Sequence, residues 1–353
     1  MTKNLFAAAA VITLLIGGCT LRSSGSGGNA SPDQVYTAAP SIDQVRSMFG
    51  SSSWWPGTPT FGVRPLDLES TPQSVRFTIT QRYVRLGSGD SIHVDYLVYA
   101  STSTATTFMN NIQSSLSGNV ATTPKAGDQV LYTGQKQPTV TALYETDAIV
   151  RLGQIVAVAA VKQGSGFVDH NQLGRLANLL VSRLKDALAN KLHPTLLARG
   201  DQQLLPPAGT DVTLLGIAKL PVQVAADMLD AASPENFTTS FKELGASDFV
   251  FGDYALNADL HMEVRAAVFT FSSSSAGATW IDAFIGKTNL SASGVFLQYI
   301  DAIKQYIGVF VAGSHGAILM CKSTLETEAA SRACETPMVR VIDAWQVSLN
   351  NVR

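Results

Sequence analysis

Residues 98–109 read VYASTSTATTFM, and residues 270–281 read TFSSSSAGATWI. In both stretches an apolar run of strand character ends at an aromatic residue. Ser and Thr residues then supply the N-cap of a helix whose inward side begins at Phe108 or at Trp280. The chain therefore carries one pattern twice, and we predict an internal duplication.

The elements around these two helices recur in the same order. Strands joined by short turns must pair antiparallel, because a parallel crossover needs about a dozen residues or more. The sequence thus predicts an α+β fold of two tandem units, each one antiparallel sheet with helices packed on it. The matching segments are opening helices from Ile42 and Val222, strand pairs at 75–86 with 92–99 and 249–255 with 262–271, hairpins at Gly153 and Gly313, and closing helices through Leu173–Leu184 and Met338–Leu349.

Composition shifts divide the chain into five segments. Residues 19–38 are a Ser/Gly-rich tether that cannot bury a core, and residues 191–211 hold Pro and Gly residues typical of a linker. We therefore expect a leader at 1–18, units at 39–190 and 212–353, and these two connecting segments.

The first residues resemble the leader of bacterial lipoproteins. Lys3 precedes an apolar run, Leu5–Ile16, that is shorter than the ~20 residues of a membrane span, and Gly17-Gly18-Cys19 follows it like a lipobox. The resemblance implies that Cys19 carries acyl chains such as palmitate. It places the protein on the extracytoplasmic face of the cell membrane, held there by its N-terminal lipid.

Charge excludes one class of partner. Lys and Arg number 25 against 27 Asp and Glu, and charged residues make up 15% of the chain, below the usual ~25%. No basic block is present, so nucleic acid is not an expected partner.

The order of elements, with the segments VYAS and FTFS before the Ser/Thr-led helices, resembles the extracytoplasmic sensor domain of PknH-type bacterial serine/threonine kinases and related PsbP-like lipoproteins. This resemblance implies a small-ligand or partner-binding module with a cleft. Cys321 stands where the sensor domain has a disulfide cysteine, although the first unit has no such cysteine.

Two cysteines remain after Cys19. Cys321 and Cys334 enclose a short loop, and an oxidising compartment would let them form a disulfide. Two free buried thiols are the alternative. A metal site is disfavoured because no histidine follows His315, so two further ligands are missing.

Motifs of catalysis are missing from the sequence. There is no Gly-x-Ser-x-Gly elbow, no His-Glu-x-x-His helix and no P-loop. His93 with Asp95, and His261 with Glu263, share one face of their strands, but we interpret this face as the solvated side of a sheet. The histidines also fall four residues out of register in the repeat, so we expect no enzyme activity, cofactor or metal.

Two adjacent tryptophans, Trp54 and Trp55, follow a Ser-rich loop. Aromatic residues in loops can anchor a ligand, and with Phe61 they are our candidate ligand-binding residues. The alternatives are a loop folded back onto the first unit or the contact between the units, and contact with membrane headgroups. The sequence as a whole predicts a non-enzymatic, sensor-like lipoprotein that binds an unknown small ligand or envelope protein. An envelope scaffold and, less favoured, a hydrolase or metal enzyme are the alternatives.

Overall fold

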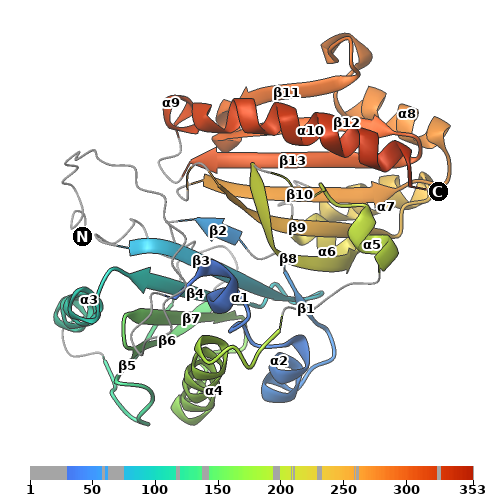
Figure 1. Ribbon diagram of the computed structural model, residues 1–353. Coiled ribbons are helices and arrows are strands. Elements are labelled where there is room, and N and C mark those ends of the chain that lie inside the picture. The colour runs from blue at the N-terminus through green and yellow to red at the C-terminus, as the bar shows by residue number, and fades with distance from the viewer. Residues whose placement is uncertain are drawn as a thin grey trace.

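The computed structural model describes residues 30–57, 60–62, 75–116, 120–136, 143–193, 199–207, 209, 211–228, 233–257, 259, 262–323 and 327–352. Over these residues the chain forms two α+β units, each with its own antiparallel sheet (Figure 1). The predicted fold class is therefore confirmed. The leader, Cys19 and the first part of the tether lie outside the described residues, so the lipid anchor stays a prediction.

The first sheet has the order β1-β3-β4-β7-β6-β5, with β2 also paired to β3. Helix α4 buries its stripe of Leu173, Leu176, Leu180 and Leu184 against one face, and α3 covers part of the other face through Met109. The elements are α1 (Pro32–Tyr36), α2 (Ile42–Phe49), β1 (Trp54–Pro56), β2 (Thr60–Gly62), β3 (Val75–Arg85), β4 (Ser91–Tyr99), α3 (Thr102–Ser115), β5 (Gln129–Lys136), β6 (Tyr144–Leu152), β7 (Ile155–Gln163) and α4 (His170–Leu188).

The second sheet has the order β11-β12-β13-β10-β9-β8. Helix α10 lies across one face and α8 lies on the other (Figure 1). The elements are α5 (Arg199–Gln203), β8 (Val212–Pro221), α6 (Val222–Met228), α7 (Pro234–Glu243), β9 (Asp248–Leu256), β10 (Met262–Thr270), α8 (Ser274–Phe284), η1 (Lys287–Asn289), β11 (Val295–Ile300), η2 (Asp301–Ile303), β12 (Gln305–Ala312), β13 (His315–Ser323), α9 (Glu328–Ser331), η3 (Arg332–Cys334) and α10 (Glu335–Asn350).

The two sheets share one strand order. Strands β3-β4-β7-β6-β5 of the first unit correspond to β9-β10-β13-β12-β11 of the second. The registers agree too: Ser91 faces Lys162 as Glu263 faces Lys322. Ser91 and Glu263 are 172 positions apart, the same interval that separates the two aligned capped helices (263 − 91 = 172). This agreement is what the predicted duplication requires.

Four of these elements differ from the sequence expectations. The end of the predicted tether is helix α1, because Val35 and Ala38 are fully buried in the first core. The second unit opens with strand β8, before the expected helix, and helix α7 follows that helix without having been predicted. The predicted linker contains the short helix α5.

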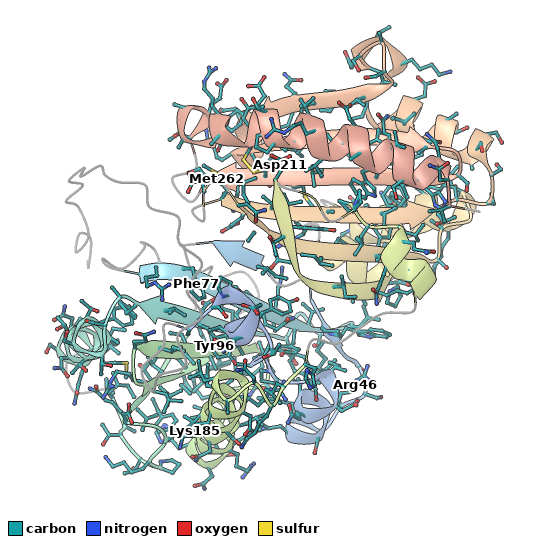
Figure 2. The ribbon with its side chains drawn as sticks, viewed as in Figure 1. Arg46, Phe77, Tyr96, Lys185, Asp211 and Met262 are labelled. Carbon is teal, nitrogen blue, oxygen red and sulfur yellow. A yellow bond between two sulfur atoms is a disulfide. The ribbon has the colours of Figure 1, made fainter. Side chains whose placement is uncertain are left out.

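A seam joins the units, and we define it as the contact of α1, β1 and β2 with β8, β9 and β10. Leu215 of β8 and Ala255 of β9 belong to the core of the first unit, while Val84 of β3 belongs to a core of the second. The residues that follow α1 are also held on the first unit. The Tyr96 hydroxyl, on β4 of the first sheet (Figure 2), donates a hydrogen bond of 2.9 Å to the carbonyl of Ala38.

Candidate functional site

The tryptophan segment forms a strand. Strand β1 pairs antiparallel with β3, placing Trp54 opposite Arg85 and Trp55 opposite Val84. Neighbouring side chains of a strand point to opposite faces, so the two rings separate. Trp54 is only 3% exposed, and its ring centroid lies 5.8 Å from that of Phe49 on α2. Trp54 is thus a core residue of the first unit.

Trp55 lies on the seam. Its partly buried ring packs against the second-unit core that contains Val84, and the Arg46 guanidinium carbon sits 5.6 Å from the ring centroid. Arg46 also donates a hydrogen bond of 3.1 Å to the Trp54 carbonyl, which fixes α2 to β1. Cation–π and apolar contacts therefore already occupy much of the Trp55 ring.

Phe61 reaches the same seam through its backbone. It pairs with Ile79 of β3, and β2 also contacts β9 and β10. Its side chain lies outside the described residues. The three candidate residues are thus brought to one region, but Trp54 and Trp55 point to opposite faces. Their ligand-binding role stays a prediction.

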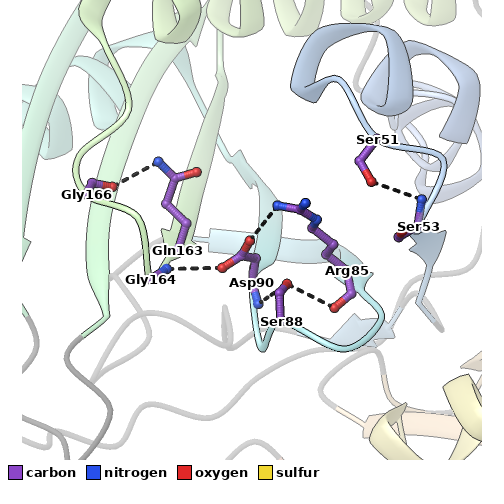
Figure 3. A network of polar contacts seen from close by, with 8 residues as sticks. All are labelled: Ser51, Ser53, Arg85, Ser88, Asp90, Gln163, Gly164 and Gly166. Carbon is purple, nitrogen blue, oxygen red and sulfur yellow. Dashed lines mark hydrogen bonds and ion pairs between the residues drawn. The ribbon is translucent and has the colours of Figure 1, made fainter.

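A polar network holds the β3–β4 turn next to the tryptophan strand (Figure 3). Asp90 is 7% exposed and pairs with Arg85 at 3.1 Å, while its other carboxylate oxygen accepts a hydrogen bond of 3.1 Å from the Gly164 amide. Ser53 joins this network from the other side, because its carbonyl accepts a hydrogen bond from the Leu86 amide. These contacts give the polar groups of the turn partners and join Ser53, just before β1, to the end of β3.

The histidine–carboxylate pairs do not correspond to each other. In the observed register, His93 faces Arg82 and Ala160, and its equivalent in the second unit is Arg265, while the backbone of His261 lies outside the described residues. Our interpretation of a solvated face was wrong for Asp95, which is fully buried. The Thr80 hydroxyl donates a hydrogen bond to the Asp95 carboxylate, which helps this carboxylate to be buried.

The two remaining cysteines form the predicted disulfide. Cys321 at the end of β13 is bonded to Cys334 in η3, and both are buried beside Met262 (Figure 2). The bond ties the turn before α10 to the sheet. Among the described residues, no group of three His, Cys, Asp or Glu side chains could hold a metal ion.

A groove lies between β11 and α10 on the described surface, with a volume of about 480 Å³. We call it the β11–α10 groove. Its floor and walls include Val295 and Leu297 of the strand and Val339, Ile342 and Asp343 of the helix. Val339 is 43% exposed, although it sits beside the buried stripe of α10.

Sequence reasoning missed this groove. Strand β11 was not singled out, and Val339 falls outside the apolar stripe that predicted α10. The available signal was an uncharged run, Val295–Ile300, without Pro or Gly. A Val outside the apolar stripe of its helix was a second, weaker signal.

The ionisable groups with shifted pKa values near the second sheet include His315 and Asp211. Partial burial lowers the pKa of His315, whose Nδ1 lies 2.9 Å from the Thr270 hydroxyl. The hydrogen bond from Arg340 lowers the pKa of Asp211, at the start of β8. Packing at the β12–β13 hairpin explains the shift at His315, and docking of α10 through Arg340 explains the shift at Asp211.

Comparison with solved structures finds a weak likeness to a sensor-kinase domain. The extracellular domain of PknH from Mycobacterium tuberculosis superposes with a TM-score of 0.38 at 12% sequence identity, over 46% of this chain and all of that domain. No protein-family model matches the chain, and no curated protein matches it. None of the helices in the described ranges is long and apolar enough to cross a membrane.

Proposed function

We propose that this protein is a non-enzymatic, lipid-tethered binding module of the extracytoplasmic face of the membrane, and that it contacts its partner through the β11–α10 groove. The groove is the observation that carries the proposal. It combines a concavity, walls of mixed apolar and polar side chains and an exposed Val339 with a strand at the edge of its sheet. Such a surface suits recognition of another molecule.

The proposed location rests on two features. The leader-like residues up to Cys19 suit lipidation, and the Cys321–Cys334 disulfide suits an oxidising compartment. The anchor is tested with Cys19→Ser under metabolic labelling with a fatty-acid analogue. We expect label on the wild type only, and label retained on the serine variant contradicts the anchor.

The binding role is tested by photo-crosslinking in intact cells. A benzophenone amino acid is placed at Val339 and, as the matched control, at Phe167 of the first unit, which is 52% exposed. We expect an adduct from position 339 and none from position 167. Mass spectrometry of the adduct then distinguishes a protein partner, as an envelope scaffold would have, from a small ligand.

The opposing hypothesis is an enzyme that uses a histidine. Stoichiometric metal in the purified protein that is lost in His93→Ala and in His261→Ala would overturn the non-enzymatic assignment. Equal adduct yields at positions 339 and 167 would overturn the groove as the contact surface.

A further inference from the structure

The two units can be compared residue by residue at the place of the β11–α10 groove. Helices α4 and α10 align at an interval of 165 positions (338 − 173 = 165). Strands β5 and β11 align at the same interval, because Val130 and Val295 each face the residue three positions before the hairpin glycine. The buried stripes of the two helices then coincide: Leu173, Leu176, Ala177, Leu180 and Leu184 fall on Met338, Val341, Ile342, Trp345 and Leu349. The space between β5 and α4 is therefore the first unit's counterpart of the groove.

The first unit fills this space with its own chain. Pro124 lies so close to α4 that a Cβ at Gly174 would overlap its ring. The Tyr132 hydroxyl donates a hydrogen bond of 2.7 Å to the Pro124 carbonyl. The side-chain amide of Asn178 donates one of 3.5 Å to the Lys125 carbonyl. A chain segment that offers carbonyl oxygens to the strand and to the helix thus occupies the first copy.

The second unit leaves the corresponding space open. Val339 stands where the first unit has Gly174 and borders the groove of about 480 Å³, while Ser291 and Ser293 line it without filling it. Ser291 also bonds both backbone groups of Val295. Its amide donates a hydrogen bond of 2.8 Å to the Val295 carbonyl, and its hydroxyl accepts one of 3.2 Å from the Val295 amide. The chain therefore closes the start of β11 itself and leaves a space within the ~300–1,000 Å³ of small-molecule sites.

One charged side chain selects the chemistry of the occupant. Asp343 of α10 is the only acid or base among the described residues that line the groove, and it stands where the first unit has Asn178. Arg340, one turn earlier, is already bonded to Asp211, and Asp343 itself forms no ion pair in the described part of the chain. A carboxylate only accepts hydrogen bonds, whereas the Asn178 amide donates one to the chain that fills the first unit. Asp343 therefore favours an occupant that offers a donor, and a cation is the strongest donor.

The remaining walls favour an apolar body on that cation. Val339 and Ile342 of α10 line the groove together with Val295 and Leu297 of β11. Covering these side chains removes apolar surface from water. A second copy paired at β11 would bring an uncharged strand, Val295–Ile300, and so would leave the carboxylate without a cation. A small amine with an apolar body satisfies both the walls and the charge.

We infer that the β11–α10 groove binds a small amphiphilic amine, whose apolar body lies on Val339 and Leu297 and whose ammonium group pairs with the Asp343 carboxylate. This inference rests on the proposed function and names the class of its ligand. The first unit lacks both the open space and the charge, since its own chain lies there against Asn178. The duplication has thus given one closed copy and one open copy of the same site.

The charge preference is tested with two probes that share one apolar body, 3-phenylpropylamine and 3-phenylpropanol. Their dissociation constants are measured from methyl resonances of the full chain in mild detergent. Each probe is compared between protein variants, so that its partition into detergent cancels. We expect Asp343→Asn, which installs the first unit's residue, to weaken binding of the amine about three- to fivefold and to leave the alcohol unchanged. The matched control is Asp43→Asn, at a side chain of the first unit that is 89% exposed, and it should change neither.

The location is tested by filling the groove. Val339→Trp places a large side chain in the open space, and we expect it to abolish binding of 3-phenylpropylamine. Val347→Trp is the control, because Val347 lies on the same helix, is 64% exposed and does not line the groove. Both positions are exposed, so both variants should keep the melting temperature of the wild type.

Each contrary outcome has a separate meaning. Absence of amine binding by the wild type, equal amine affinity in the wild type and Asp343→Asn, or equal losses in the two Trp variants overturns the inference. Any of these results together with a protein adduct at position 339 leaves the proposed function standing and removes the amine. A dimer in analytical ultracentrifugation that Val339→Trp dissociates replaces the amine by a second copy.

Discussion

Gly216 is the position at which one added methyl group tests the seam. An ideal Cβ built there would overlap the phenol of Tyr36, which reaches β8 from helix α1. Gly216 sits at the register irregularity of β8 and faces Asp253 of β9. Burial of the phenol, and after it the negative charge of Asp253, raise the pKa of Tyr36, so the hydroxyl is held in a desolvated place. Gly216→Ala should therefore force Tyr36 or β8 to move.

The cost follows from overpacking, which destabilises a well-packed site by about 1–3 kcal/mol. Tyr36→Ala alone should cost ~3–5 kcal/mol, as aromatic truncations do where the ring is packed. In the Tyr36→Ala background the added methyl group finds space, so Gly216→Ala should cost less than ~1 kcal/mol there. The free energies of unfolding come from urea titrations followed by circular dichroism, and the double-mutant cycle should give a coupling of ~1–3 kcal/mol.

Additive effects would refute this reasoning. If Gly216→Ala costs the same in both backgrounds, α1 does not rest on β8 and the units do not share this contact. Ser88→Ala, at the exposed β3–β4 turn, provides a control that should be additive with Tyr36→Ala.

Three other changes test the packing of the two units. Trp54→Ala should lose ~3–5 kcal/mol of unfolding free energy in urea, because the ring is buried, and Trp55→Ala should lose less; a larger loss at Trp55 would contradict the assigned faces. Replacing both Cys321 and Cys334 by Ser should lower the free energy of unfolding by ~3 kcal/mol for a loop of this length. Thermal melting of the variant is compared with that of the oxidised and the reduced wild type. An unchanged melting temperature would contradict a structural role of the disulfide. Burial raises the pKa of Tyr96 far above its usual 10.0, so the folded state keeps a proton that the unfolded state releases above pH 10.0. The free energy of unfolding should therefore fall as the pH rises past that value, and tyrosinate absorbance should appear together with the loss of circular dichroism. Ionisation of Tyr96 without unfolding would contradict its burial.

Sequence patterns predicted most of the fold because the repeated elements are local. The Ser/Thr caps at Ser101 and Ser273 each accept a hydrogen bond from the backbone amide three residues on, as capping predicts. The hairpins at Gly153 and Gly313 need a left-handed residue, which glycine supplies without strain. These signals depend on a few neighbouring residues, so a sequence reveals them.

The features that the sequence did not predict have a different cause, because each of them depends on contacts with a distant part of the chain. Helix α1 has the composition of a tether, but Arg183 of α4 donates hydrogen bonds of 2.8 Å and 3.0 Å to the carbonyls of Thr37 and Ala38 at its end. Asp95 is buried because Thr80 faces it across the sheet. No periodicity along the sequence records such partners.

The site was predicted less well than the fold. Strand β1 has three residues, too few for alternation to assign Trp54 and Trp55 to faces from the sequence. The β11–α10 groove arises where the outer strand of a sheet meets a helix some 40 residues later in the chain, at Val339. Its walls become neighbours only in the folded unit.

Amide hydrogen exchange of β11 tests the central claim most directly. Exchange is measured by mass spectrometry on the protein in native membrane vesicles and on the same protein after purification, with the edge strand β8 as an internal reference. If the β11–α10 groove binds a partner, amides of Val295–Ile300 exchange at least about tenfold more slowly in vesicles while β8 is unchanged. Equal exchange of β11 in both samples would contradict the claim that this edge is the binding surface.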